Sequence, residues 1–372
     1  MISYKKELEL LKRSDRFRNR KIFKEKLIDM ASNDYLGLST NKKLFRKAYN
    51  EVIKEKYLSP KASMLVNGYS KLHKKFEDKL SKLNRFENGI VVGSGFLANI
   101  SLIESMIRKK DILFIDEEYH ASGILATNLV QGNVIVFKHN DYQDLENKLK
   151  EFNALNYRTM IAIEGVYSMG GDIAPKEFND LANTYNSILL VDEAHSSGVI
   201  GKGLLGWYDY WGITPNQNHI KMGTLGKAYG SYGAYILASN EIISFLENRA
   251  KPIIYSTAPS LFDISLAYVN LKYIIKNKNK IIKRIKKNQK VIKKRLNIDV
   301  NSLIVPIEIN SNKDVIDIQN YILEKGYIIG AIRQPTVKKA ILRVIIKNDI
   351  KKKDLLKVIN YLQNFRYNRK KL

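Results

Sequence analysis

The sequence predicts an α/β protein with a large domain built on a buried, mostly parallel sheet and a smaller α+β domain at the C-terminus. Two observations support this prediction. Short apolar runs alternate with helical stretches between residues 40 and 245, and after residue 260 a long helical region precedes separate strands and helices. Uninterrupted apolar runs are typical of strands covered on both faces. With 372 residues, 45% of them hydrophobic, the chain can bury a substantial core.

The elements predicted in chain order define three segments. Residues 1–38 form an N-terminal arm with a helical pattern at Leu8, Leu11 and Phe17, followed by the compact segment ASNDYLGLS. Residues 39–255 form the large domain, with strands at 89–92, 112–115, 134–137, 160–163 and 188–191 and helices at 72–83 and 178–185. Residues 256–372 form the C-terminal domain, with strands at 303–309, 327–332 and 341–346 and helices at 315–325 and 353–365.

The chain is strongly basic, with a formal charge of +26. Twelve Lys or Arg and no acid occur between Lys272 and Arg295, while Ile274, Ile281 and Ile285 recur at helical spacing, which predicts an amphipathic helix with a basic outer face. We favour a solvated helix face over a nucleic-acid surface, although attraction of an anionic substrate carrier stays open.

Two absences limit the possible chemistry and location. The chain contains no Cys, so covalent catalysis would depend on Lys, Ser, Thr, Asp, Glu or His. No apolar run has the length of a membrane-spanning helix, and the N-terminus shows no apolar signal core. We therefore expect a cytoplasmic protein that does not enter a membrane.

A single Lys between small residues is the strongest local signal. Lys227 lies in HIKMGTLGKAYGSYGAYI, residues 219–236, and a glycine-rich turn leads from it into an apolar strand. Such an amine can form a Schiff base with an aldehyde cofactor, and the Thr224 hydroxyl could approach a phosphate. Taken alone, the segment would be better explained as an ordinary surface lysine in a loop.

An acidic residue ends another predicted strand. In SILLVDEAHSSGVIGKG, residues 187–203, Asp192 follows the apolar run and His195 comes three residues later. A carboxylate there can pair with a protonated pyridine nitrogen, and the imidazole can reach a ring hydroxyl. A metal pair and a nucleotide-binding acid are weaker alternatives, because no third ligand and no glycine-rich phosphate loop ending in Lys-Ser or Lys-Thr are found.

Three further strand ends carry polar or glycine residues. Gly93–Ser94–Gly95 joins a strand to a helix whose N-terminal N–H groups can hold a phosphate. His120 follows the strand at 112–115 and could stack on a planar ring, although a lone His is often structural. Glu164 and Ser168 follow the strand at 160–163. Together, the five segments describe a site for one cofactor.

These segments closely resemble the α-oxoamine synthase family of fold-type I pyridoxal-phosphate enzymes over nearly the whole chain. The matching motifs are ASNDYLGLS, SGFLAN, HAS, EGVYSMGGD, VDEAHSSGVIG, GTLGKAYGSYG, NRAKPIIYSTAP and IRQPTV. The resemblance implies a seven-stranded-type sheet flanked by helices and a homodimer with active sites at the subunit interface. It also implies pyridoxal 5′-phosphate as the cofactor and no metal.

The resemblance assigns roles to individual residues. Lys227, Asp192 and His120 are the expected catalytic residues: Lys227 carries the cofactor as a Schiff base, Asp192 pairs with the ring nitrogen and His120 stacks on the ring. The remaining expected cofactor contacts are Gly95, Phe96, Ser168, His195, Thr224 and Thr257, the last toward the partner subunit's phosphate. The expected substrate contacts are Arg18, Asn33, His120, Thr336 and Arg343.

Within the family, NDYLGLS, NRAKPIIYSTAP and IRQPTV look most like the branch that condenses L-alanine with a pimeloyl thioester in biotin biosynthesis. The expected products are 8-amino-7-oxononanoate, CO₂ and the free thiol carrier, which is coenzyme A or acyl carrier protein. Two alternatives stay open within the family: a 2-amino-3-ketobutyrate ligase using glycine and an enzyme like serine palmitoyltransferase using serine. A nucleic-acid-binding protein on a degenerate fold is the distant alternative.

Overall fold

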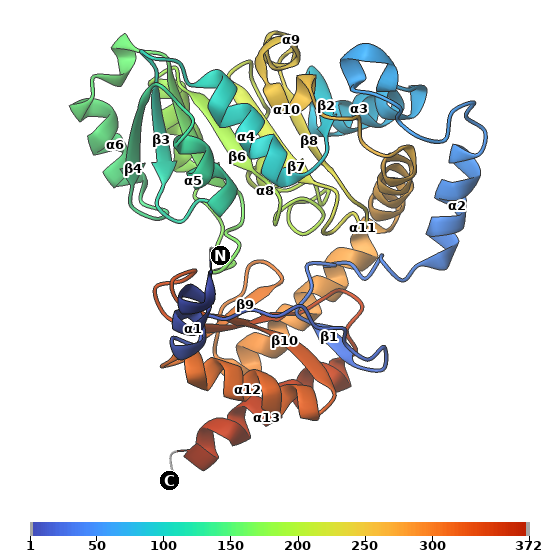
Figure 1. Cartoon of the computed structure of the whole chain (residues 1–372), viewed down its shortest axis with the longest axis vertical. Helices are drawn as coiled ribbons and strands as arrows, with labels where there is room; N and C mark the ends of the chain where they lie inside the picture. The colour runs from blue at the N-terminus through green and yellow to red at the C-terminus, as the bar shows by residue number, and fades with distance from the viewer. Residues whose placement is uncertain (1–2, 370–372) are drawn as a thin grey trace. The chain divides into compact units, whose positions relative to one another are not determined.

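The structure is a computed structural model that describes residues 3–369 and divides them into two compact units. The large unit comprises residues 36–168 and 172–282, and the small unit comprises residues 3–35, 169–171 and 283–369. The helix α11 (Leu261–Leu296) contributes to both units (Figure 1). The domain boundaries expected from the sequence, at 38/39 and 255/256, differ from this division and remain predictions.

The large unit contains a seven-stranded sheet with the strand order β2-β8-β7-β6-β5-β3-β4. Neighbouring strands are parallel except at β8, which is antiparallel to β2 and β7. A nine-residue turn joins β7 to β8, and a connection this short permits only antiparallel pairing. The strands are β2 (Asn88–Val92), β3 (Ile112–Asp116), β4 (Asn133–Phe137), β5 (Thr159–Glu164), β6 (Ile188–Asp192), β7 (His219–Thr224) and β8 (Ala234–Ala238).

Helices cover both faces of this sheet. Successive strand residues point to opposite faces, so Leu113 and Ile115 pack with α4, α5, α9 and α10, whereas Phe114 contacts Phe152 just after α6. In Figure 1, α4 and α5 lie in front of the strands. The helices of the large unit, besides its part of α11, are α2 (Lys42–Val52), α3 (Lys71–Asn84), α4 (Gly95–Met106), α5 (Ala121–Thr127), α6 (Tyr142–Glu151), α7 (Glu177–Thr184), α8 (Trp207–Trp211), α9 (Asn240–Arg249) and α10 (Lys251–Ile254), with a π-helix η1 (Met64–Gly68) and a 3₁₀ helix η2 (Ala154–Asn156).

The predicted fold class is confirmed. The five apolar runs of the large domain form strands β2 to β6, and every residue of β3 and β5 is buried. The basic amphipathic helix is also confirmed, because Ile274, Ile281 and Ile285 in α11 are buried. None of the helices in the described part of the chain is both long and apolar enough to cross a membrane.

The small unit contains a four-stranded sheet with the order β1-β10-β11-β9. The predicted C-terminal strands and helices are present as β9 (Ile304–Glu308), α12 (Asn312–Glu324), β10 (Tyr327–Ile332), β11 (Ile341–Ile345) and α13 (Lys352–Arg369). The N-terminal residues add α1 (Lys5–Arg13) and β1 (Ile28–Met30), which pairs in parallel with β10. Sequence patterning missed β1, because three residues are too few to show a period.

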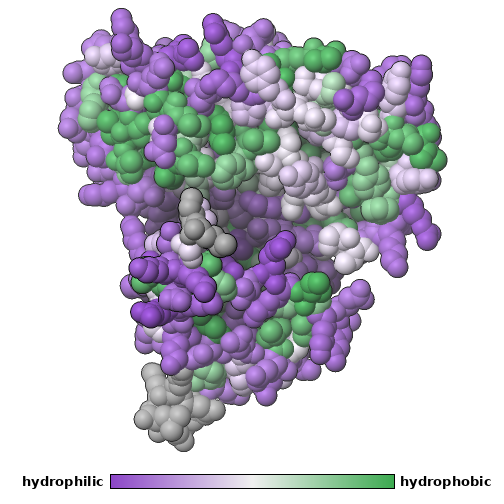
Figure 2. Space-filling model, in the orientation of Figure 1, coloured by the Kyte–Doolittle hydropathy of each residue, from purple (hydrophilic) through white to green (hydrophobic). Residues whose placement is uncertain are grey.

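Apolar side chains are exposed on one part of the large unit. Figure 2 shows hydrophobic residues gathered where Figure 1 places α4 and α5. The exposed apolar side chains there include Phe96 on α4, Ile124 and Leu125 on α5, and Leu129 just after α5. Exposed apolar patches are a common feature of binding surfaces.

Candidate active site

A cavity of about 200 Å³ lies in the large unit where strands β5, β6 and β7 end. Ligands of sheets of this type bind at the carboxyl ends of the strands, because the loops that follow them meet there. The residues lining the cavity are Gly95, Phe96, Asn99, His120, Glu164, Asp192, Ala194, His195, Met222, Thr224 and Lys227. Seven of the thirteen residues expected at the site from the sequence are therefore brought together.

Lys227 and His195 face each other in this cavity, with the Lys227 Nζ 2.7 Å from the His195 Nε2. The turn that carries Lys227 is fixed by its own backbone: Leu225 donates to the Gly233 carbonyl at 2.8 Å, and Gly230 donates to the Lys227 carbonyl at 3.0 Å. These bonds fix the backbone that carries Lys227, and the contact with His195 positions its amine.

Close packing under the turn explains one glycine of the VDEAHSSGVIG motif. Gly198 has φ +82°, and a Cβ at this position would lie 2.4 Å from the Cβ of Ala228. Only glycine avoids both the backbone strain and the collision. The loop after β6 and the turn that carries Lys227 are thereby packed directly against each other.

Asp192 is the last residue of β6 and is buried. Its Oδ2 accepts a hydrogen bond from Asn99 Nδ2 at 2.9 Å, and its Oδ1 accepts one from the Ala194 backbone N–H at 2.9 Å. Both oxygens thus have a donor, which fixes the orientation of the carboxyl group.

Asn99 links Asp192 to the next helix and was not singled out in the sequence. Its Nδ2 also donates to Ser122 Oγ at 2.9 Å, and its Oδ1 accepts a bond from the Tyr119 hydroxyl at 2.9 Å. The available signal was an amide side chain in the mostly apolar segment 96–103, because a buried amide needs partners.

His120 lies at the N-cap of α5, where its Nδ1 is 2.7 Å from Ser122 Oγ and accepts a hydrogen bond from the Ser122 N–H at 3.2 Å. Burial lowers the pKa of His120; the Asp192 charge acts in the opposite direction, and Lys227 adds to the lowering. The ring is therefore neutral near pH 7 and offers a flat surface to the cavity.

The N-terminus of α4 borders the same cavity. Ser94 caps the helix by accepting a hydrogen bond from the Leu97 N–H at 3.2 Å. The N–H groups of Gly95 and Phe96 belong to the first turn, where an α-helix provides no internal acceptor. These N–H groups and Thr224 form a cradle suited to a phosphate group.

Glu164 is not among the site residues expected from the sequence. It is the last residue of β5, it is buried, and it lines the cavity. Burial raises the pKa of its carboxyl well above the ordinary value, and the neighbouring Asp192 charge raises it further.

A network beside the cavity was also missed. The His139 Nδ1 lies 3.1 Å from Asp116 Oδ1, and its Nε2 lies 2.9 Å from Asp172 Oδ2. Tyr167 donates to the second Asp116 oxygen at 2.8 Å. Burial alone would lower the pKa of His139, but its bonds with the two carboxylates raise it to about 10. This network fixes the loop after β5.

Two expected site residues of the large unit do not line the cavity. Ser168 donates from its backbone N–H to Glu164 Oε2 at 3.1 Å. Thr257 is exposed, after α10. Their expected contacts with the cofactor stay predictions.

The expected substrate residues outside the cavity lie in the small unit, in two pairs. Arg343, buried in β11, donates to Asn33 Oδ1 at 3.0 Å and to the Tyr35 hydroxyl at 3.3 Å. Arg18 donates to Thr336 Oγ1 at 3.3 Å. Residues about 310 positions apart in the sequence are thus brought together in each pair.

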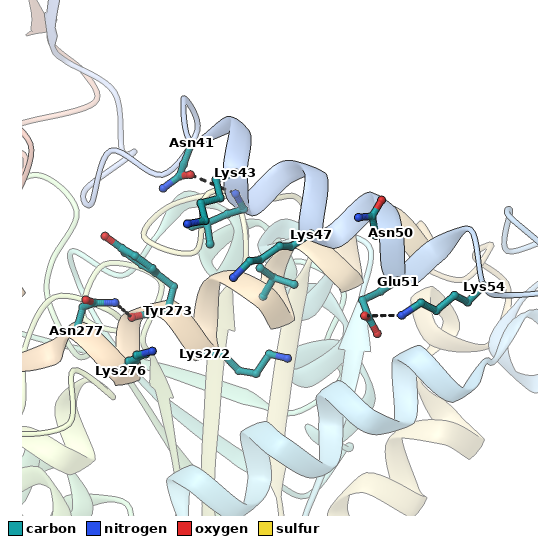
Figure 3. A pocket seen from close by; sticks show the side chains of 12 residues that line it. Asn41, Lys43, Lys47, Asn50, Glu51, Lys54, Lys272, Tyr273, Lys276 and Asn277 are labelled. Carbon is teal, nitrogen blue, oxygen red and sulfur yellow. Dashed lines mark hydrogen bonds and ion pairs between the residues drawn. The ribbon is translucent and has the colours of Figure 1, made fainter.

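A larger pocket of about 630 Å³ lies between α2 and α11 (Figure 3). The charged side chains around it are Lys43, Lys47, Glu51, Lys54, Lys272 and Lys276. Glu51 pairs with Lys54 at 3.1 Å. None of the residues expected to hold the cofactor lies here, so the smaller cavity is the candidate active site. In residues 3–369, no group of three or more His, Cys, Asp or Glu side chains is placed to hold a metal ion.

Comparisons with known proteins show the family of the chain. A family model of class I and II aminotransferases matches residues 25–362. The chain is 44% identical to an 8-amino-7-oxononanoate synthase of Helicobacter pylori over 364 residues, which cover 97% of each chain. It is 34% identical to an 8-amino-7-oxononanoate synthase of Thermosipho melanesiensis, with 89% of this chain and 86% of the relative covered.

Solved structures give the same fold. A crystal structure of an 8-amino-7-oxononanoate synthase from Francisella tularensis has a TM-score of 0.74 and 26% identity, covering 92% of this chain and all of that one. A serine palmitoyltransferase structure with pyridoxal phosphate has a TM-score of 0.85 over 91% of this chain and 87% of the other. Its 22% identity supports the fold alone.

Proposed function

Because this chain belongs to the class I and II aminotransferase family and, within it, to the α-oxoamine synthases, we propose that it makes 8-amino-7-oxononanoate for biotin biosynthesis. The substrates are L-alanine and a pimeloyl thioester. A bond forms between the alanine α-carbon and the thioester carbonyl carbon, the C–S bond breaks, and the alanine carboxylate leaves as CO₂. The observation that carries the proposal is the cavity in which Lys227, His195 and Asp192 meet.

The cofactor is pyridoxal phosphate, and the residues of the cavity fit it. They provide a Lys amine, a carboxylate with a donor at each oxygen, a helix N-terminus and a flat neutral imidazole. When bound, the cofactor supplies an aldehyde for amines and a ring that delocalises the electron pair left when the α-proton is removed. Lys227 would hold the aldehyde, Asp192 the ring nitrogen, and Gly95, Phe96 and Thr224 the phosphate.

Lys227 is also the group best placed to move the α-proton of alanine. Its Nζ is part-buried beside His195, which limits the directions in which the amine can move. A neutral amine accepts a proton, so an amine at this position can act as the base. The neutral His120 ring would cover one face of the cofactor, and Asp192 would keep the ring nitrogen protonated.

Arg343 is the proposed partner of the amino-acid carboxylate. A guanidinium binds a carboxylate through two parallel hydrogen bonds. Asn33 and Tyr35 already accept bonds from Arg343 and hold its plane in place. Arg18 and Thr336, which are joined to each other, are proposed to contact the acyl substrate.

We further propose that the protein acts as a homodimer in the cytoplasm. The exposed apolar side chains of Phe96, Ile124, Leu125 and Leu129 support a protein contact on the large unit. Exposed Thr257 would reach the phosphate of the partner subunit's cofactor. Size-exclusion chromatography with light scattering should give twice the mass of the chain.

The experiment that tests the function is product formation by the purified protein with pyridoxal phosphate, read by mass spectrometry. L-alanine, glycine and L-serine are each supplied with pimeloyl-coenzyme A and, separately, with the pimeloyl thioester of acyl carrier protein. The expected product is 8-amino-7-oxononanoate from L-alanine only. Lys227→Arg keeps the charge of the side chain and should abolish turnover. A preference for glycine or serine would refute the alanine assignment and retain the family.

A further inference from the structure

Glu164 and Asp192 lie side by side at the ends of neighbouring strands. They are register partners in the parallel pair of β5 and β6, so their side chains project from the same face of the sheet. Both are buried and both line the cavity. The Gly165 N–H donates to the Asp192 carbonyl at 2.8 Å, which extends the pairing beyond the two residues.

The hydrogen-bond partners of the two carboxyls differ. Asp192 has a donor at each oxygen, whereas Glu164 Oε2 accepts one bond from the Ser168 N–H at 3.1 Å. The other oxygen, Glu164 Oε1, is buried and has no hydrogen-bond partner among the described residues. Buried polar atoms almost always have a partner, so this atom points to a ligand.

The charges around Glu164 favour its protonated form. A carboxylate disfavours ionisation of a second carboxyl beside it, and Glu164 has fewer donors than Asp192. Burial raises the pKa of Glu164, and Asp192 and Asp116 raise it further, while Lys227 and the Ser168 N–H act against them. The other titratable groups beside it are Tyr119 and Tyr167, whose pKa values burial raises, and His120, whose pKa burial lowers.

The strand order indicates which part of the cofactor Glu164 meets. The phosphate cradle lies at β7 and the start of α4, Asp192 ends β6, and Glu164 ends β5 on the side of β6 away from β7. On pyridoxal, the side of the ring across the nitrogen from the phosphate arm carries a methyl group and, next to it, a hydroxyl group. The oxygen of this hydroxyl group is called the ring oxygen. Only the ring oxygen accepts a hydrogen bond.

We propose that Glu164 is a cofactor-binding residue that acts as a neutral carboxylic acid and donates a hydrogen bond from Oε1 to the ring oxygen of pyridoxal phosphate. The role rests on the proposed function. Glu164 in this form leaves Asp192 as the one negative charge that faces the ring nitrogen. A protonated carboxyl is a donor, whereas an ionised one only accepts.

The first test is the protonation state of Glu164 in the protein without cofactor, read by infrared difference spectroscopy at neutral pH. The wild type should show the C=O stretching band of a protonated carboxylic acid, and Glu164→Gln should lose it. Glu77, whose pKa burial raises to about 7, contributes a band that E164Q leaves in place. The matched control is Glu193→Gln, because Glu193 is equally buried but accepts bonds from Trp207 and Tyr208. A wild-type spectrum without a band assignable to Glu164 overturns the proposal.

The second test is the affinity for pyridoxal phosphate, measured by dialysis, with melting temperatures of the cofactor-free proteins to detect misfolding. Glu164→Gln keeps a neutral donor and should bind within about threefold of the wild type, whereas Glu164→Met keeps the volume without a donor and should bind about tenfold more weakly. Equal binding by E164M and the wild type overturns the donor role. If E164Q binds as weakly as E164M while both melt normally, the negative charge is needed and the proposal fails.

The two tests separate this inference from the proposed function. Neither depends on acyl transfer, so a protein that binds pyridoxal phosphate and makes a different product still tests Glu164. A protein that binds no pyridoxal phosphate would refute the proposed function, and the infrared band would still decide the protonation state of Glu164.

Discussion

Replacing Lys221 with Met should strongly destabilise the large unit. Lys221 lies in β7, almost fully buried, with its Nζ 3.4 Å from Glu193 Oε1. The Nζ also donates to Asn84 Oδ1 at 2.9 Å and to the Leu205 carbonyl. Lys221→Met fills the same volume but leaves the buried Glu193 without its cationic partner, which costs about 3–5 kcal/mol.

The two tryptophans provide a local assay. Trp207 and Trp211 are the only Trp residues of the chain. The backbone N–H of Trp207 donates to the Glu193 carboxylate at 2.6 Å. Urea unfolding of the cofactor-free protein, followed by Trp fluorescence, therefore reports on the segment that the ion pair holds. A loss of this size should lower the urea midpoint by roughly 1 M or more.

A double-mutant cycle shows whether the pair is the cause. Glu193→Gln removes the negative charge and keeps the shape, so K221M/E193Q contains neither charge. It should be more stable than K221M alone, with a coupling energy of about 0.5–3 kcal/mol. If the losses of unfolding free energy caused by K221M and E193Q simply add in the double variant, the Lys221–Glu193 ion pair does not stabilise the large unit. The reasoning is then refuted.

Three further changes test the surroundings of the cavity. His139→Gln should remove about 1.5–3 kcal/mol of stability at neutral pH. Because the folded pKa of His139 is raised to about 10, this contribution is full below about pH 6.5 and is lost as the pH rises through about 10. Denaturation curves of the variant and the wild type should therefore converge only at the alkaline end of that range. Asn99→Ala removes one hydrogen-bond donor from Asp192 and the acceptor of the Tyr119 hydroxyl. Dialysis should show that this variant binds pyridoxal phosphate about tenfold more weakly than the wild type. Unchanged affinity would mean that Asn99 does not orient Asp192. Gly198→Ala should cost more stability than Gly212→Ala in the same urea assay, because only the Cβ added at Gly198 collides with Ala228. Gly212, with φ +71°, has no atom within 4 Å of an added Cβ, so Gly212→Ala should show only the backbone strain of about 1–2 kcal/mol. Equal losses would show that the contact with Ala228 is unimportant.

Motifs and apolar runs could be found in the sequence because they are local. The runs of β3 and β5 are uninterrupted, and buried parallel strands require this. The expected residues lie at or just after the end of a strand or at the start of a helix, and parallel strands bring their carboxyl ends to one edge. These residues are Lys227, Asp192, His195, His120 and Gly95. The meeting of these side chains in one cavity thus followed from pattern and topology.

The interactions that were missed join residues whose separation in the sequence carries no period. Strand β1 has three residues, and its pairing with β10 depends on a partner about 300 positions away. His139 bonds with Asp116 and Asp172, which are 23 and 33 residues distant. No local pattern distinguishes such a His from a solvated one.

The sequence by itself determined the fold class, the family and the strand ends that carry the cofactor chemistry, because these depend on residue type and short spacing. Only the tertiary structure decided which neighbours each carboxyl meets. Asp192 has donors at both oxygens, while Glu164, one strand away, keeps an oxygen without one. That difference arises from strand register and burial, which bring distant residues together and set the cost of leaving a charge without a partner.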